Sequence, residues 1–144
     1  MPESGMTCQT EGMFDLQVNG FAGVDYNNPN LDVEEYEHSL QKMLATGVTA
    51  CLPTLISASE DHLASCFNAL EKARRDSSLA QSMVLGYHLE GPFLSAESGY
   101  RGCHPPEAMC AGNIDFFDRL QEVAGGMIRM VTVAPEIEGV LPMI

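Results

Sequence analysis

An α/β fold built around a parallel sheet is the fold class that this sequence predicts, on two observations. Four short apolar runs with the character of strands are spread along the 144 residues, and segments with helical periodicity separate them. Strands that alternate with helices favour a parallel sheet, because a helix is the usual crossover between parallel strands. The composition, with 45% hydrophobic and 19% charged residues, is typical of a globular domain.

The predicted strands cover residues 14–20, 49–55, 83–90 and 129–134. The first predicted helix lies between the first two strands, at 31–46. Apolar side chains share one of its faces at a spacing of 3.6 residues, and they are Leu31, Tyr36, Leu40, Met43 and Leu44. Gly47 is placed as the C-terminal stop of this helix.

The second and third predicted helices have recognisable N-termini. The second begins near residues 57–60, where Ser57 and Glu60 have capping-box spacing, and its apolar stripe follows at Leu63, Phe67 and Leu70. The third covers 114–124, with Asn113 as its N-cap and Gly125 as its stop. Together these elements give the order βαβαβαβ.

This order and the near-regular strand spacing match repeated βα units, and four units make half of a (β/α)8 barrel. A small flavodoxin-like open sheet is the alternative. A short helical turn is expected at 106–110, and the last residues resemble the start of a fourth helix. We expect the strands to be parallel neighbours in chain order. Residues 1–12 are interpreted as a flexible leader and 13–144 as one domain.

Charge and cysteine content exclude several classes of partner. The net charge is −13 and the pI is about 4.4, so nucleic acid and anionic membrane surfaces are poor partners. No run of eighteen apolar residues is present, and the N-terminus lacks the basic and apolar regions of a secretory signal. Five cysteines without a CxxC pattern favour free thiols in a reducing, cytoplasmic setting, with Cys51 and Cys66 as buried apolar residues.

Polar side chains gather where the predicted strands end. Gln17 and Asn19 share one face of the first strand, and His88 and Glu90 share one face of the third. In parallel α/β folds, ligands bind at the carboxyl ends of the strands. The sequence therefore predicts a common site at these ends.

Glu90 is the main candidate in this site. A carboxylate at an inner strand end is costly unless it is paired or binds a cation, and a divalent metal would suit it. The alternative is a pairing with lysine or arginine, or simple exposure. His88 is interpreted first as a packed, hydrogen-bonded core residue. His104 follows a glycine-bearing loop and is either a substrate contact or a surface residue, whereas His38 and His62 are expected at the surface.

Four segments carry a resemblance to a known family. FDLQVNGFAGVDY, TGVTACLPTLIS, GYHLEGPFLSAESGYRGCHP and VTVAPE follow one another as they do in N-acetylglucosamine-6-phosphate deacetylases of the amidohydrolase superfamily. The chain resembles this family over about residues 11–144. The resemblance implies a TIM barrel, with 13–144 as its N-terminal half. It also implies hydrolysis of N-acetylglucosamine 6-phosphate to glucosamine 6-phosphate and acetate.

The resemblance also implies roles for individual residues. Glu90 matches the glutamate that binds one divalent metal, zinc or iron, while Cys103 and His104 match positions that touch the amino sugar. Gln17 and Asn19 stand where many amidohydrolases have His-x-His, and His88 would support the site. Such a metal acidifies water and polarises the acetamide, and a general base then moves the proton.

The family's two metal-binding histidines and its catalytic aspartate lie on later strands, so no catalytic residue is expected within this chain. We therefore expect a fragment that is inactive in isolation, from a parent protein that is cytoplasmic, homodimeric and specific for an amino-sugar phosphate. One alternative is a non-catalytic half-barrel that binds a partner or a sugar phosphate. Another is an amidohydrolase acting on a cyclic amide, for which His-x-His would be the preferred pattern.

Overall fold

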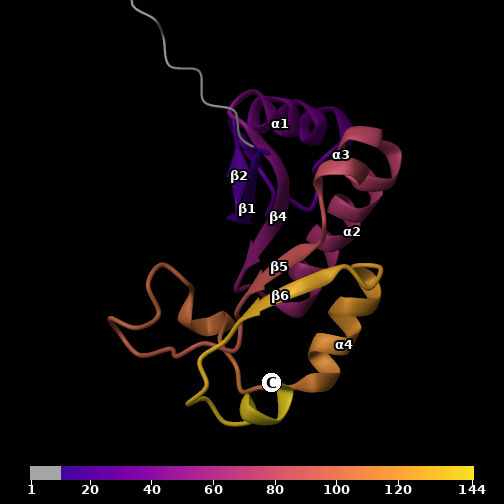
Figure 1. The fold of residues 1–144 in the computed structure, drawn as a ribbon. Helices are drawn as coiled ribbons and strands as arrows, with labels where there is room; N and C mark the ends of the chain where they lie inside the picture. Colours follow the sequence, from indigo (N-terminus) through magenta and orange to yellow (C-terminus); the bar gives the residue numbers. More distant parts are fainter. Residues whose placement is uncertain (1–10) are drawn as a thin grey trace, which may run out of the picture.

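The computed structural model describes residues 11–144, so nearly all of the predicted leader lies outside the described residues. A mixed set of strands and helices forms one α/β unit (Figure 1). In chain order the elements are β1 (Met13–Val18), β2 (Gly20–Phe21), β3 (Val24–Asp25), α1 (Val33–Ala45), β4 (Val48–Ile56), α2 (Glu60–Asp76), α3 (Ser78–Met83), β5 (Tyr87–Glu90), the 3-10 helix η1 (Pro106–Ala108), α4 (Ile114–Val123), β6 (Ile128–Thr132) and the 3-10 helix η2 (Leu141–Met143).

The main sheet has the strand order β1-β4-β5-β6, and all of its pairs are parallel. This confirms the prediction of four parallel neighbours in chain order. A short antiparallel pair, β2 with β3, was not predicted. It is a tight hairpin in which Ala22 and Gly23 adopt φ values of 53° and 85°. Strands of two residues are too short to show an alternating pattern, which is why the sequence did not reveal them.

The α-helices lie along one side of the sheet, and the segment between β5 and α4 extends away from it (Figure 1). Because all four main strands run the same way, their carboxyl ends meet at one edge of the sheet. The long segment 91–113 begins at that edge, immediately after Glu90. The fold therefore places this segment beside the predicted site.

Side-chain caps explain where the helices begin. Asp32 accepts a 2.8 Å hydrogen bond from the Glu35 amide at the start of α1, and Asn113 caps α4 as predicted. The predicted helix α2 is present, but its capping residue was wrong, because Ser59 is the N-cap and Ser57 is not. Glu60 follows Ser57 by three residues and Ser59 by one, so the local sequence alone did not show which serine caps the helix.

Three other sequence predictions need correction. Residues 78–83 form the helix α3, so the third strand begins at Tyr87 and not at Met83. A short apolar run such as 83–85 does not distinguish a strand from a buried helix end. Leu44, placed on the buried face of the first helix, is 44% exposed. The chain end forms only the short helix η2 and no α-helix.

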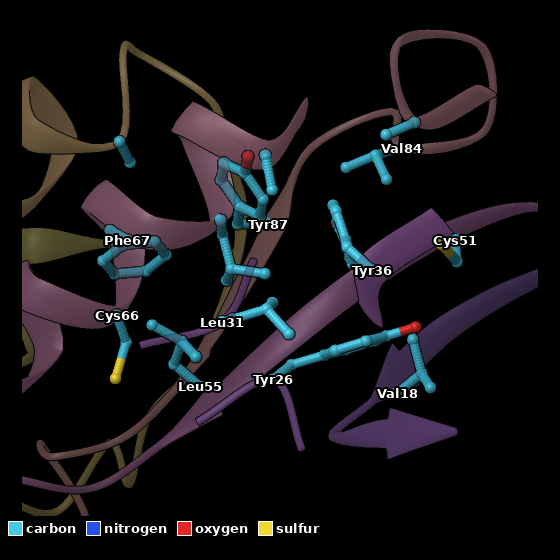
Figure 2. Packing of buried hydrophobic residues seen from close by; sticks show 14 of the residues in the cluster. Val18, Tyr26, Leu31, Tyr36, Cys51, Leu55, Cys66, Phe67, Val84 and Tyr87 are labelled. Carbon is cyan, nitrogen blue, oxygen red and sulfur yellow. The ribbon is translucent and has the colours of Figure 1, made fainter. Parts of the chain in front are cut away.

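The hydrophobic core lies between the sheet and its helices (Figure 2). Tyr26 and Tyr36 pack edge to face with ring centroids 5.3 Å apart, and Phe67 packs against Tyr87 at 5.6 Å. The predicted stripe of α2, Leu63, Phe67 and Leu70, is fully buried, as are Cys51 and Cys66. This core joins the helices to the strands that position the site.

Among residues 11–144, no helix has both the length and the apolar character needed to cross a membrane.

Candidate functional site

Glu90, the last residue of β5, is the centre of the site. Its Oε2 accepts a 2.9 Å hydrogen bond from the Gln17 side-chain amide, and its Oε1 lies 3.6 Å from Nε2 of His104. The Glu90 side chain is 20% exposed. Within residues 11–144, no lysine or arginine forms an ion pair with it. The Glu90 carboxylate is therefore held at the sheet edge by a neutral amide, and the His104 imidazole lies beside its other oxygen.

The residues predicted from the first strand have different roles. Gln17 reaches Glu90 from β1 across the intervening strand β4. Asn19 turns to the backbone instead and donates to the Thr54 carbonyl at 3.4 Å. Asn27, which the sequence analysis did not select, donates to the same carbonyl and accepts from the Ile56 amide. Asn19 and Asn27 thus secure the end of β4, while Gln17 contacts the carboxylate.

His104 is buried beside Glu90 and not at the surface. Its Nδ1 lies 2.9 Å from the hydroxyl of Ser57, the residue that directly follows β4. The Ser57 hydroxyl also donates to the Glu90 carbonyl at 3.3 Å. Sequence reasoning missed Ser57 as a site residue, although its position after a predicted strand was a usable signal.

The loop that carries His104 is held by its own backbone. The Tyr100 and Arg101 amides both donate to the Glu97 carbonyl at 3.1 Å, and the His104 amide donates to the Arg101 carbonyl at 3.2 Å. The Arg101 guanidinium closes the turn by donating to the His104 carbonyl at 3.2 Å. These bonds direct the His104 ring back toward the strand ends.

A cavity of about 470 Å³ lies between this loop and the ends of β5 and β6. Its lining includes Glu90, Arg101, Cys103, His104, Thr132 and Glu136. The structure thus brings the predicted Cys103 and His104 to the same cavity as Glu90. A larger groove of about 630 Å³ beside α1 and α2 is lined by none of the predicted site residues, so the chemistry favours the smaller cavity.

His88 lies deeper in the sheet and is 1% exposed. Its Nδ1 lies 3.2 Å from the Thr54 hydroxyl on β4, and its Nε2 lies 2.7 Å from the Thr132 hydroxyl on β6. The Thr54 hydroxyl also accepts a hydrogen bond from the Val18 amide of β1. Burial lowers the pKa of His88, and the nearby Glu90 charge offsets this in part. A neutral His88 therefore joins three strands through hydrogen bonds.

The donor atoms fit one position of a metal site and no more. A carboxylate at an open cavity is a good ligand for a divalent cation. Residues 11–144 contain no group of three or more histidine, cysteine or acidic side chains that could hold a metal ion. Catalytic metal sites use about three protein ligands, so Glu90 could supply only part of one.

Comparisons with known proteins agree with the motif resemblance. No protein-family model matches the chain. The chain is 37% identical over 135 residues to the N-acetylglucosamine-6-phosphate deacetylase of Caenorhabditis elegans, covering 89% of this chain and 31% of that protein. It is 34% identical over 127 residues to the deacetylase of the same name from Bacillus subtilis, covering 87% and 31%. An N-acetylgalactosamine-6-phosphate deacetylase of Escherichia coli O157:H7 is 33% identical, with coverages of 88% and 32%.

Solved structures show the same relationship. The N-acetyl-D-glucosamine-6-phosphate deacetylase of Mycobacterium smegmatis, in complex with N-acetyl-D-glucosamine-6-phosphate, superposes with a TM-score of 0.79 at 29% identity. The match covers 92% of this chain and 32% of that one. The Pasteurella multocida enzyme superposes with a TM-score of 0.74 at 28% identity, covering 90% and 32%. The chain is thus similar to these hydrolases over most of its own length and spans about a third of theirs.

Proposed function

We propose that this chain forms the first half of a (β/α)8 barrel in an N-acetylglucosamine-6-phosphate deacetylase. The whole protein would hydrolyse N-acetylglucosamine 6-phosphate to glucosamine 6-phosphate and acetate. The observation that carries this proposal is the meeting of Glu90 and His104 at one cavity, with Gln17 hydrogen-bonded to Glu90, in a chain 37% identical to a deacetylase. Four parallel strands with helices along one side support the half-barrel.

Each residue of the site has a distinct part in this proposal. Glu90 would hold one coordination position of a divalent metal, zinc or iron. Gln17 orients the carboxylate through its 2.9 Å hydrogen bond and leaves Oε1 directed toward the His104 side. The bound metal would supply Lewis-acid chemistry at the acetamide carbonyl. The remaining metal ligands and the general base would come from parts of the barrel outside these 144 residues.

The substrate would lie in the 470 Å³ cavity. His104 and Cys103 would contact the amino sugar there, and Arg101 is a positive charge on the same wall. His88 would support the floor of the site, because it ties the ends of β4, β5 and β6 together. The Escherichia coli relative favours N-acetylgalactosamine 6-phosphate as a second candidate substrate, since its name differs from the others only in the sugar.

The test is an acetate-release assay on the protein encoded by the complete reading frame that contains these residues. N-Acetylglucosamine 6-phosphate, its galactosamine counterpart and unphosphorylated N-acetylglucosamine are compared, with metal present and after chelation. We expect metal-dependent release, fastest from the phosphorylated glucosamine sugar. A metal-loaded protein that releases acetate from none of them would refute the proposal and favour a non-catalytic half-barrel. The homodimer and the cytoplasmic location stay predictions.

A further inference from the structure

Ser57 contacts both Glu90 and His104, from which it lies 33 and 47 positions away in the sequence. It is 2% exposed and directly follows β4. Its hydroxyl lies 3.3 Å from the Glu90 carbonyl and 2.9 Å from Nδ1 of His104. Ser57 does not line the cavity itself, so its effect on a ligand would act through His104.

The two hydrogen bonds of Ser57 favour one tautomer of the His104 imidazole. A serine hydroxyl has a single hydrogen, and a carbonyl oxygen can only accept. The Ser57 hydrogen is therefore directed to the Glu90 carbonyl, which leaves the serine oxygen as an acceptor for Nδ1 of His104. This network assigns the tautomer of a neutral His104 imidazole, with the hydrogen on Nδ1 and a lone pair on Nε2.

We propose that Ser57 is a positioning residue that keeps His104 in the Nδ1–H tautomer, so that Nε2 faces the cavity as a hydrogen-bond acceptor. Nε2 lies 3.6 Å from Oε1 of Glu90, which is too long for a good direct hydrogen bond. Both groups therefore offer acceptor atoms to a ligand that brings its own donors, such as sugar hydroxyls or an amide N–H. The binding of an amino-sugar ligand by Nε2 rests on the proposed function, whereas the tautomer of His104 does not.

Gly91 provides the space that this arrangement needs. A Cβ atom at Gly91 would lie 2.1 Å from the Ser57 hydroxyl oxygen, and φ at this position is +82°. Any side chain there would displace the serine or strain the backbone. The glycine after Glu90 is thus explained by the hydroxyl that packs against it.

The tautomer can be measured directly on the 144-residue chain. Long-range proton–nitrogen NMR spectra of the 15N-labelled chain distinguish Nδ1–H from Nε2–H. They are recorded at a pH at which the imidazoles are neutral. His104→Gln assigns the signal. We expect Nδ1–H in the wild type, a change toward Nε2–H in Ser57→Ala, and the wild-type pattern in Ser57→Thr. Ser95→Ala, at a serine that lines the cavity but does not contact His104 through a hydrogen bond, should leave the tautomer unchanged.

The wild-type spectrum is decisive even if Ser57→Ala fails to fold. Nε2–H as the main form in the wild type would overturn the proposal. An unchanged tautomer in a folded Ser57→Ala variant would overturn it too.

A second measurement separates this inference from the proposed function. In the protein with the complete barrel, Ser57→Ala should raise KM for the amino-sugar phosphate about tenfold, the effect of one hydrogen bond, with unchanged metal content. Ser57→Thr should restore KM. An unchanged KM in Ser57→Ala would overturn the link to the ligand. If the wild type has no activity but shows the Nδ1–H tautomer, the proposed function fails and the positioning role of Ser57 stands.

Discussion

The side-chain amide of Gln17 donates a 2.9 Å hydrogen bond to Oε2 of Glu90, a residue 73 positions further along the chain. The two residues come from β1 and β5, which are not neighbours in the sheet because β4 lies between them. This bond occupies one carboxylate oxygen, and His104 lies 3.6 Å from the other. The Gln17 amide therefore sets the orientation of the Glu90 carboxylate before any ligand arrives.

Replacing Glu90 by glutamine tests its role in the protein with the complete barrel. Glu90→Gln retains the shape of the side chain but removes the anion, so metal content and turnover should both fall steeply while the thermal melt is preserved. Metal analysis and acetate release measure these effects. Glu107→Gln, at an exposed position on η1, is the matched control and should change neither. Full metal occupancy and full rate in Glu90→Gln would make the carboxylate purely structural.

The isolated 144-residue chain should show no measurable deacetylase turnover. One carboxylate cannot complete a catalytic metal site, which needs about three protein ligands, and residues 11–144 contain no cluster of that size. Acetate release from N-acetylglucosamine 6-phosphate, with zinc or iron added, measures this. Robust metal-dependent release from the pure chain would show that the site is complete without further segments.

His88 should contribute to stability through its two threonine partners. His88→Leu removes both hydrogen bonds in the sheet interior and should lower the free energy of unfolding by about 1–3 kcal/mol. Urea unfolding of the isolated chain measures this loss, and His38→Leu at an exposed helix position is the control. In the complete barrel, His88→Gln should cost about 10–100-fold in metal affinity or activity. Equal stability of His88→Leu and the wild type would refute the structural role.

Glu71 should make the stability of the chain sensitive to acid. Burial raises its pKa, but hydrogen bonds from Arg74, Tyr87 and Arg75 outweigh this and lower the pKa below its usual value. A carboxylate with a lowered folded-state pKa stabilises the fold fully above its unfolded-state pKa, and the contribution is lost as the pH falls through the folded-state pKa.

We therefore expect the free energy of unfolding to decrease as the pH falls below about 4.5, and Glu71→Gln to flatten this decrease. At pH 7 the variant should be less stable by about 1–3 kcal/mol, because three donors lose a charged acceptor. Thermal melts between pH 3 and pH 7 measure both effects. Glu60→Gln, which breaks an exposed ion pair with Arg119, should have a much smaller effect. Parallel pH profiles for wild type and Glu71→Gln would contradict this prediction.

The Tyr36 hydroxyl is buried and has no hydrogen-bond partner among the described residues. Tyr36→Phe should therefore raise the free energy of unfolding by about 1 kcal/mol, because it removes a buried polar atom without a partner. Tyr26→Phe is the matched comparison, since its hydroxyl lies 2.6 Å from the Ser39 hydroxyl. That variant should lose about 1 kcal/mol. Similar losses in both variants, measured by urea unfolding, would show that Tyr36 has a partner after all.

The sequence by itself determined the four strands of the main sheet, most of the helices and the edge of the sheet where the chemistry would lie. These features depend on local signals. The end of an apolar run placed Glu90 at a strand end, and side-chain capping placed Asn113 at the start of α4. The parallel order followed as well, because consecutive right-handed βαβ units make neighbours in the sheet.

Only the tertiary structure decided which side chains meet. Strand register aligns Ile56 with Glu90, so the residue after Ile56, Ser57, lies beside the Glu90 carbonyl and does not cap α2. The turn of the loop brings His104 back to that hydroxyl, and Gln17 rather than Asn19 reaches the carboxylate. Contacts between residues 33 to 73 positions apart depend on register, sheet twist and loop path, and these produce no periodic pattern in the sequence.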